Sequence, residues 1–196
     1  MDMRRVAVRR VNEWDGPSML KIYTPYTGTP AAPEASPPDL QDYVQRIDQY
    51  TYGLGWLLCE IDYQTAGFCH LSEDPGDPED LFSVEFRLYV KQGLLRRGVG
   101  AALWSLMRDM MEMGNRRRVL VRVHPENQEA LGFFAAMGFV PLEGEPPAEP
   151  EKRWLVYHLK PWDPEAPKPT KPYLVEADDY EAAREHAATL VNTQGL

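Results

Sequence analysis

Cysteine is scarce in this sequence: there are two, Cys59 and Cys69, and both lie in apolar segments with strand character. A disulfide framework needs more cysteines, and such frameworks are typical of short secreted chains. We therefore expect two reduced thiols in the core. A metal site is not indicated either, because no His, Cys, Asp or Glu residues recur at the spacing of metal ligands.

Long apolar runs and an excess of basic residues are missing as well. No segment approaches the roughly 20 apolar residues of a membrane-spanning helix, and the first residues contain no apolar run of signal-peptide length. We therefore expect a cytoplasmic protein without a membrane partner. The net charge of −9 argues against nucleic acid as a partner, because proteins that bind nucleic acid usually carry a basic surface.

What the 196 residues do contain is an alternation of strand and helix patterns, which is typical of an α/β or α+β layered fold. The predicted order of elements is β-α-α-β-β-β-α-β-α-β, with one more strand near residues 139–142. Asp15 and Asp39 are the expected N-terminal caps of the first two helices. Gly114 and Gly138 are the expected ends of the last two.

The composition changes after residue 160, where prolines become frequent. We predict one folded domain over residues 1–160, a semi-rigid Pro-rich linker over 161–177, and a C-terminal helix and tail over 178–196. A narrow stripe of apolar and alanine residues on that helix predicts that it docks on its own domain or on a second subunit. A homodimer is therefore one candidate assembly.

The stretch "RRGVG", Arg96 to Gly100, falls between a strand that ends near Val90 and a helix that begins near Val99. The start of a helix has unpaired N–H groups and the positive end of the helix dipole, so it attracts anions. Glycines let the backbone approach a phosphate, and arginines add charged donors. The turn is neither a Walker P-loop nor a dinucleotide fingerprint. By itself it fits a phosphate site and close helix packing equally well.

Two longer stretches, "LYVKQGLLRRGVGAALW" and "VLVRVHPENQEALGFFAAMGF", decide between these readings. They resemble the two conserved patterns of the GNAT superfamily of acyl-CoA-dependent N-acetyltransferases. The resemblance extends in element order over about residues 5–160. The matching positions are Val90, Gly98, Val99, Gly100 and Leu103 in the first stretch, and Asn127, Ala130, Gly138 and Phe139 in the second.

The resemblance implies a mixed, mostly antiparallel central sheet with helices on both faces. It also implies that the strands ending near Val90 and Val123 splay apart and hold the pantetheine of acetyl-CoA, the co-substrate, while loop amides hold its pyrophosphate. The residues implied in coenzyme binding are Leu88, Tyr89, Val90, Leu95, Arg96, Arg97, Gly98, Val99, Gly100, Ala101, Asn127 and Phe134.

Two positions depart from the family pattern. Leu95 stands where the family has Arg or Gln at the start of the loop, a small departure because backbone amides do most of the binding there. Phe134 stands where many members carry a tyrosine that protonates the departing thiolate. A phenyl ring cannot donate a proton, so another group or water replaces it, or catalysis is weak.

Glu85 is the first candidate for the catalytic base. Period-two alternation in "SVEFRLYV" puts Glu85, Arg87 and Tyr89 on one face of a strand. A carboxylate in a central strand is costly unless it faces a cleft or a partner, and a structural pair with Arg87 is the alternative. The strand also resembles "TVExSVYV" of the phosphinothricin-type acetyltransferases, in which that glutamate is regarded as the base.

His124 is the rival base, because it ends a strand beside the expected cleft and histidine titrates near neutral pH. It fits a cap of the following helix equally well. Tyr89 lies on the Glu85 face, where it lines the pocket or replaces the missing tyrosine acid.

The acceptor is expected to be a small primary amine. The acidic loop "SEDPGDPED", residues 72–80, precedes the Glu85 strand, and carboxylates near a site attract ammonium groups. We therefore expect a cationic amine, such as a polyamine, an amino sugar or a peptide amine; the other interpretation of these carboxylates is a solvated loop with no part in binding. The alternatives are an anionic amino acid of the phosphinothricin type, or a non-catalytic acyl-CoA-binding module.

Overall fold

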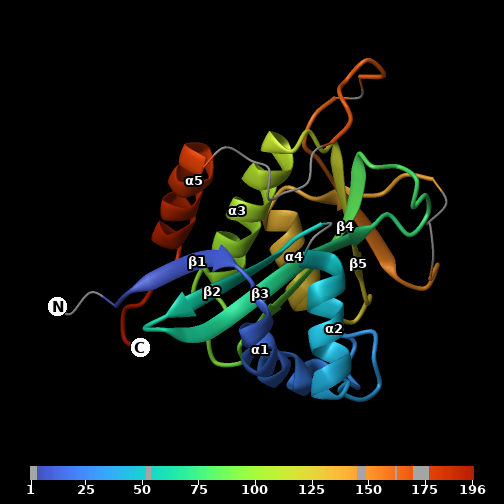
Figure 1. Ribbon diagram of the computed structural model, residues 1–196. Coiled ribbons are helices and arrows are strands. Elements are labelled where there is room, and N and C mark those ends of the chain that lie inside the picture. The colour runs from blue at the N-terminus through green and yellow to red at the C-terminus, as the bar shows by residue number, and fades with distance from the viewer. Residues whose placement is uncertain (1–3, 52–53, 145–148, 162, 170–176) are drawn as a thin grey trace.

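The computed structural model describes residues 4–51, 54–144, 149–161, 163–169 and 177–196. Their strands form one sheet of seven strands in the order β1-β2-β3-β4-β5-β7-β6 (Figure 1). Neighbouring strands are antiparallel except β4 and β5, which run parallel. This confirms the predicted mixed, mostly antiparallel sheet. The strands are β1 (Val6–Arg10), β2 (Trp56–Ile61), β3 (Gln64–Glu73), β4 (Ser83–Val90), β5 (Arg118–Val123), β6 (Val140–Pro141) and β7 (Arg153–His158).

Helices cover both faces of the sheet (Figure 1). The first two lie on one face, and the other three on the opposite face. The order of elements agrees with the prediction, with β6 as the additional strand. The helices are α1 (Gly16–Tyr23), α2 (Leu40–Thr51), α3 (Val99–Met113), α4 (Gln128–Ala136) and α5 (Ala177–Thr189), and the 3₁₀ turns are η1 (Glu13–Asp15) and η2 (Thr24–Tyr26).

Each face of the sheet has its own core, and β4 contributes to both. Its Val84, Phe86 and Val90 are buried against α3. Tyr89 instead packs in the cluster that α1 and α2 form with Trp56 of β2. The alternation predicted for β4 is therefore confirmed, and its residues 85, 87 and 89 face the side of α1 and α2.

The predicted helix caps differ in their outcome. The Asp39 carboxylate accepts the N–H of Asp42 at 2.8 Å, as a cap of α2 should. Asp15 precedes α1 but makes no side-chain hydrogen bond to it. Its carboxylate instead accepts hydrogen bonds of 2.8 Å from both terminal nitrogens of Arg9. A charged guanidinium is a stronger hydrogen-bond donor to a carboxylate than a backbone amide is. Gly114 and Gly138 end α3 and α4 as predicted.

The strands β4 and β5 separate part of the way along. They pair only from Ser83 to Glu85, opposite Arg118 to Leu120, although both continue further. On its other side β4 stays paired with β3 up to Val90. The Lys91 N–H donates to the Ala66 carbonyl of the β3 side at 2.8 Å. Backbone groups alternate in direction along a strand, so those of Leu88 and Val90 point into the gap between β4 and β5.

The C-terminal helix docks on its own domain. It packs against α3 and β1 (Figure 1), with Ala183 and Ala187 buried and the Arg10 guanidinium 4.6 Å from the Tyr180 ring centre. Of the predicted linker, residues 162 and 170–176 lie outside the described residues. Among the described residues, no helix has both the length and the apolar composition that crossing a membrane requires.

Candidate active site

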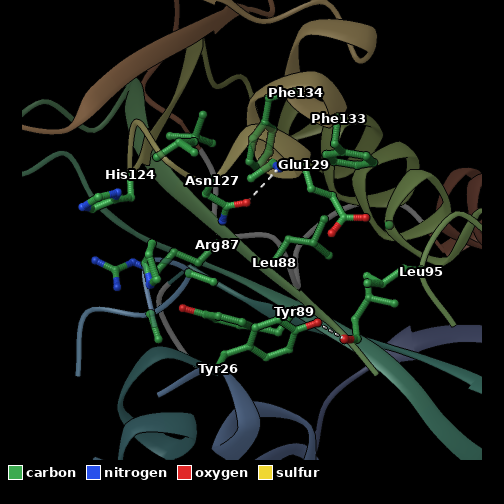
Figure 2. Close-up of a pocket in the computed structure, with 18 of the residues that line it drawn as sticks. Tyr26, Arg87, Leu88, Tyr89, Leu95, His124, Asn127, Glu129, Phe133 and Phe134 are labelled. Carbon is green, nitrogen blue, oxygen red and sulfur yellow. Dashed lines mark hydrogen bonds between the residues drawn. The ribbon is translucent and has the colours of Figure 1, made fainter. Parts of the chain in front are cut away.

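A cavity of about 870 Å³ occupies the gap between β4 and β5 (Figure 2). Its walls are the second half of β4, the end of β5, the start of α3, one face of α4, and the loop after η2 around residues 29–33. The cavity therefore connects the glycine-arginine turn with the face of β4 that carries the candidate catalytic residues.

The turn supplies backbone donors at one end of the cavity. The backbone N–H groups from Leu95 to Ala101, which we call the loop amides, lie in this turn and in the first turn of α3, where the first N–H groups of a helix have no intrahelical acceptor. Arg96 and Gly98 have left-handed backbone angles, φ 60° and φ 84°, and α3 begins directly afterwards. Clustered donors at the positive end of a helix dipole suit the pyrophosphate of acetyl-CoA.

The two arginines of the turn point in different directions. Arg96 lines the cavity, with a side chain that is 88% exposed and 3.8 Å from Glu129. Arg97 does not line it, and its Nη1 donates to the Gln194 carbonyl at 2.6 Å. The prediction that both side chains face the anion is therefore corrected, because the C-terminal tail binds the Arg97 guanidinium. Val99 lies buried in the core and offers only its backbone N–H.

The middle of the cavity is narrow and largely apolar. Phe134 is buried edge-on against Phe86 at 6.4 Å between ring centres. The Asn127 side chain accepts the Ala130 N–H at 3.1 Å, which caps α4 and fixes the cavity-facing position of Asn127 (Figure 2).

Tyr26 also lines the cavity and was not predicted. Its hydroxyl donates to the Val90 carbonyl at 2.5 Å (Figure 2). The remaining predicted coenzyme residues Leu88, Tyr89, Leu95, Gly98, Gly100 and Ala101 all line the cavity.

Glu85 lies at the fork between β4 and β5 and is 2% exposed. Its Oε1 atom is 3.2 Å from Nε of Arg87 and 2.9 Å from Nε of Arg122. Burial raises the pKa of the Glu85 carboxyl, and the Arg87 guanidinium opposes this shift. The carboxylate does not line the cavity itself, whereas both of its arginine partners do.

Charged side chains surround this end of the cavity, and three of them escaped prediction. Arg122 also donates to Glu149 at 2.5 Å, and Lys152 lines the same wall. The alternation of "VLVRV" in β5 could have placed Arg122 on the Glu85 face. No sequence signal could place Glu149 and Lys152, because they lie outside the predicted helices and strands.

His124 and Tyr89 both line the cavity. The Nδ1 atom of His124 accepts the Glu126 N–H at 3.2 Å, so the neutral ring carries its proton on Nε2. The Tyr89 ring packs edge-on against Tyr23 at 4.8 Å. Burial raises the pKa of Tyr89 to about 12, with Arg87 opposing the shift. Tyr89 is thus a proton donor at neutral pH.

The acidic loop lies at the opposite end of β4, and none of its residues lines the cavity. Asp74 is buried and 3.1 Å from Nη2 of Arg118. Asp80 accepts the Ser83 hydroxyl at 2.5 Å and is 3.8 Å from Arg117. Both carboxylates are therefore paired with basic residues of the chain itself, away from the cavity. The acidic loop thus gives no support to the expected cationic acceptor. Among the residues described, no three His, Cys, Asp or Glu side chains cluster as around a metal ion.

Solved structures of acetyltransferases have the same fold. A phosphinothricin acetyltransferase from Sinorhizobium meliloti in complex with acetyl-CoA superposes with a TM-score of 0.71 and 19% identity, covering 88% of this chain and 96% of that one. An N-acetyltransferase from Staphylococcus aureus Mu50 gives 0.70 and 14%, covering 80% and 99%. The ribosomal-protein-alanine N-acetyltransferase from Brucella melitensis gives 0.66 and 19%, covering 76% and 96%.

The sequence itself identifies the family. Residues 17–139 match the profile of the acetyltransferase (GNAT) family. That segment contains the glycine-arginine turn, both splayed strands and the walls of the cavity except Glu149 and Lys152. The chain therefore belongs to the GNAT acetyltransferase family.

Proposed function

We propose that this acetyltransferase moves the acetyl group of acetyl-CoA directly to a small primary amine that also carries an acidic group, without a covalent enzyme intermediate. The observation that supports this most is the continuity of the cavity. It runs from the loop amides, along the free edge of β4, to the charged cluster around Glu85. Neither cysteine lines it, and both thiols are buried elsewhere.

The loop amides and Arg96 hold the pyrophosphate, and the gap between β4 and β5 accepts the pantetheine. Acetyl-CoA supplies the acetyl group as an activated thioester. The Leu88 N–H points into the gap, so it can donate to the carbonyl oxygen as negative charge develops there. A preorganised backbone donor at this position is typically worth about 10²–10³ in turnover.

Glu85 is the proposed base. Its Oε1 contacts two guanidiniums, and the carboxylate accepts a proton from the ammonium through one cavity water in this proposal. The raised pKa brings the carboxyl nearer to neutral pH, which favours proton uptake from an amine. His124 is less suited, because Nδ1 already accepts the Glu126 N–H and Nε2 carries the proton.

Tyr89 is the proposed acid in place of the absent tyrosine at Phe134. The amine nitrogen bonds to the acetyl carbon, the carbon–sulfur bond breaks, and Tyr89 gives its proton to the leaving thiolate. The second proton that the nitrogen loses on forming the amide returns to the Tyr89 phenolate through a cavity water. Tyr89 and Leu88 line the same cavity. The Tyr89 hydroxyl stays protonated at neutral pH because burial raises its pKa to about 12.

The acceptor preference follows from the charges at the amine end. Arg87, Arg122 and Lys152 line the cavity there. Glu85 and Glu149 pair with the two arginines, whereas Lys152 is the cation of this group that we assign to an acidic group of the substrate. The fold shared with the Sinorhizobium meliloti phosphinothricin acetyltransferase is consistent with such an acceptor.

The test is release of coenzyme A thiol from acetyl-CoA across a panel of amines. The panel contains acidic amino acids and phosphinothricin, and separately polyamines, aminoglycosides and short basic peptides. We expect release with the acidic amines, and a KM for them that rises at least about tenfold in Lys152→Met. Release with cationic amines alone would contradict the acceptor class.

A non-catalytic acyl-CoA-binding module is the second candidate, because Phe134 removes the usual acid. It predicts a measurable acetyl-CoA affinity by calorimetry and no thiol release with any amine. The two measurements together separate it from the transferase.

A further inference from the structure

The C-terminal tail, residues 190–196, contacts the loop amides from the side opposite the cavity. Three contacts converge on two loop residues. The Asn192 N–H donates to the Arg97 carbonyl at 2.8 Å. The Arg97 Nη1 donates to the Gln194 carbonyl at 2.6 Å. The Cα of Gly98 lies against the Leu190–Val191 peptide, where a Cβ would overlap the Leu190 carbonyl oxygen.

The tail is itself anchored, so it can act as a support. It follows α5, whose Ala183 and Ala187 are buried in the core. Val191 and Leu196 pack against the same core cluster. The Arg4 guanidinium donates to the Leu196 carbonyl. A segment fixed by these contacts can hold a neighbouring loop in one conformation.

The hydrogen bond to Arg97 has a geometric consequence for the loop amides. The peptide bond between Arg97 and Gly98 is trans, so its C=O and N–H point in opposite directions. Since the tail binds the C=O, the Gly98 N–H points away from the tail. Gly98 lines the cavity on its other side, which is where that N–H is then directed.

A glycine makes this support necessary. Gly98 has φ 84°, and glycine adopts either sign of φ with little difference in energy. The peptide before it can therefore turn over, which would aim the Arg97 carbonyl at the bound anion. The hydrogen bond from Asn192 selects the orientation that presents a donor.

We propose that residues 190–194 are a positioning segment that orients the loop amides toward the pyrophosphate of acetyl-CoA. This rests on the proposed function, because it assigns a task to the same coenzyme site. It adds a segment nearly a hundred residues away in sequence to the determinants of coenzyme affinity.

The first experiment uses the full-length chain with Asn192→Pro, which removes the N–H donor. Asn192→Ala is the matched control, because it keeps the N–H and loses the same side chain, whose Oδ1 accepts the Gln194 N–H at 2.9 Å. Calorimetry should give an acetyl-CoA Kd about tenfold or more higher in Asn192→Pro than in Asn192→Ala. S-acetylpantetheine, which lacks the pyrophosphate, should show the same KM in both variants, and so should the amine.

A glycine pair provides a second approach if Asn192→Pro does not fold. Gly98→Ala places a methyl group against Leu190, on the side away from the cavity, whereas Gly93→Ala meets no atom within 4 Å at nearly the same φ of 88°. We expect Gly98→Ala to weaken acetyl-CoA binding at least about tenfold more than Gly93→Ala.

The outcomes separate the inference from the proposed function. Wild-type protein that binds acetyl-CoA, with equal Kd values in Asn192→Pro and Asn192→Ala, would overturn the positioning segment alone. Equal losses with acetyl-CoA and S-acetylpantetheine would also overturn it, because they would indicate a general structural defect. Wild-type protein that does not bind acetyl-CoA would remove the proposed function and the inference together.

Discussion

The two halves of β4 have the same alternation and different neighbours. From Ser83 to Glu85 the strand is hydrogen-bonded to β3 on one side and to β5 on the other. From Leu88 to Val90 it keeps β3 and faces the cavity where β5 has moved away. The first half is therefore ordinary sheet interior. The second half offers the backbone groups of Leu88 to a ligand, while the Val90 carbonyl accepts the Tyr26 hydroxyl.

One strand therefore contributes to the stability of the sheet and to the proposed catalytic site. Pairing on both sides fixes the fork at Glu85, and the free edge beyond it is held in place by the same strand. A backbone donor on a rigid strand loses little entropy when it binds a substrate. The proposed catalytic geometry thus depends on how the strands of the sheet pair. Substitutions in the two halves of β4 should therefore have different effects on stability and on turnover.

The largest expected effect is at the fork. Glu85→Gln should lower kcat by about 10²–10⁴-fold, because it removes the proposed base. The Kd of acetyl-CoA should change little, since the loop amides lie at the other end of the cavity. Steady-state kinetics and calorimetry on the same preparation check this. His124→Gln is the matched control and should retain most of the turnover. A stronger loss in His124→Gln than in Glu85→Gln would assign the base to the histidine.

The pH dependence tests the same residue. A base must be ionised, so kcat/KM should fall as the pH drops through the pKa of Glu85, which burial places above the usual range of a glutamate. This acidic limb should disappear from the residual activity of Glu85→Gln and persist in His124→Gln. A profile of Glu85→Gln with an unchanged acidic limb would contradict the assignment.

Proline substitutions compare the two halves directly. The N–H groups of Val84 and Leu88 point to the same side of β4, but only Val84 has β5 opposite it. Val84→Pro should unfold the protein or cost more than about 3 kcal/mol. Leu88→Pro should fold, with kcat lowered about 10²–10³-fold because the proposed oxyanion donor is gone. Thermal unfolding and thiol-release kinetics would measure both, and equal destabilisation by the two prolines would remove the distinction between the halves.

A smaller effect is expected from the tyrosine that replaces the usual acid. Tyr89→Phe should lower kcat by roughly tenfold or more, as removal of a general acid does, with little change in the acetyl-CoA Kd. Phe134→Tyr in the Tyr89→Phe background should restore part of the turnover, because Phe134 lines the same cavity. Rescue is the decisive result, and its absence together with full activity of Tyr89→Phe would exclude Tyr89 as the acid.

Modification of the two cysteines is expected to leave the activity unchanged. Cys59 and Cys69 are fully buried, and burial raises the pKa of Cys59 to about 12 and that of Cys69 well above its usual range. Because the thiolate is the reactive form, iodoacetamide should leave the activity of the native protein unchanged. Rapid inactivation, with a cysteine adduct located by mass spectrometry, would mean that a thiol takes part in the reaction.

Local patterns in the sequence predicted much of this arrangement. The order of elements, the two faces of β4 and the glycines before α3 follow from residue spacing, since each depends on a few neighbouring residues. The splayed pair and the coenzyme site came from the family resemblance. Glu85 was placed on the correct face because strand periodicity needs no knowledge of the neighbouring strands.

Contacts between segments that are distant in sequence could not be predicted. Arg122 pairs with Glu85 only because β5 lies beside β4, and Arg97 turns outward only because the tail reaches it. The acidic loop was expected at the cleft because it lies next to the Glu85 strand in sequence. The two ends of an extended strand lie far apart, however, and the loop is at the end of β4 away from the cavity. Its carboxylates therefore meet Arg117 and Arg118 at the opposite end of β4.

The anchored tail has a practical consequence for anyone who makes this protein. Leu196 contacts Arg4, so both ends of the chain lie on the same side of the molecule (Figure 1), and the residues just before Leu196 contact the turn at which we propose that the coenzyme binds. An affinity tag or fluorescent protein fused at either end would pull on that contact. A label in the exposed segment of residues 163–165 would lie away from that contact and from the proposed coenzyme loop.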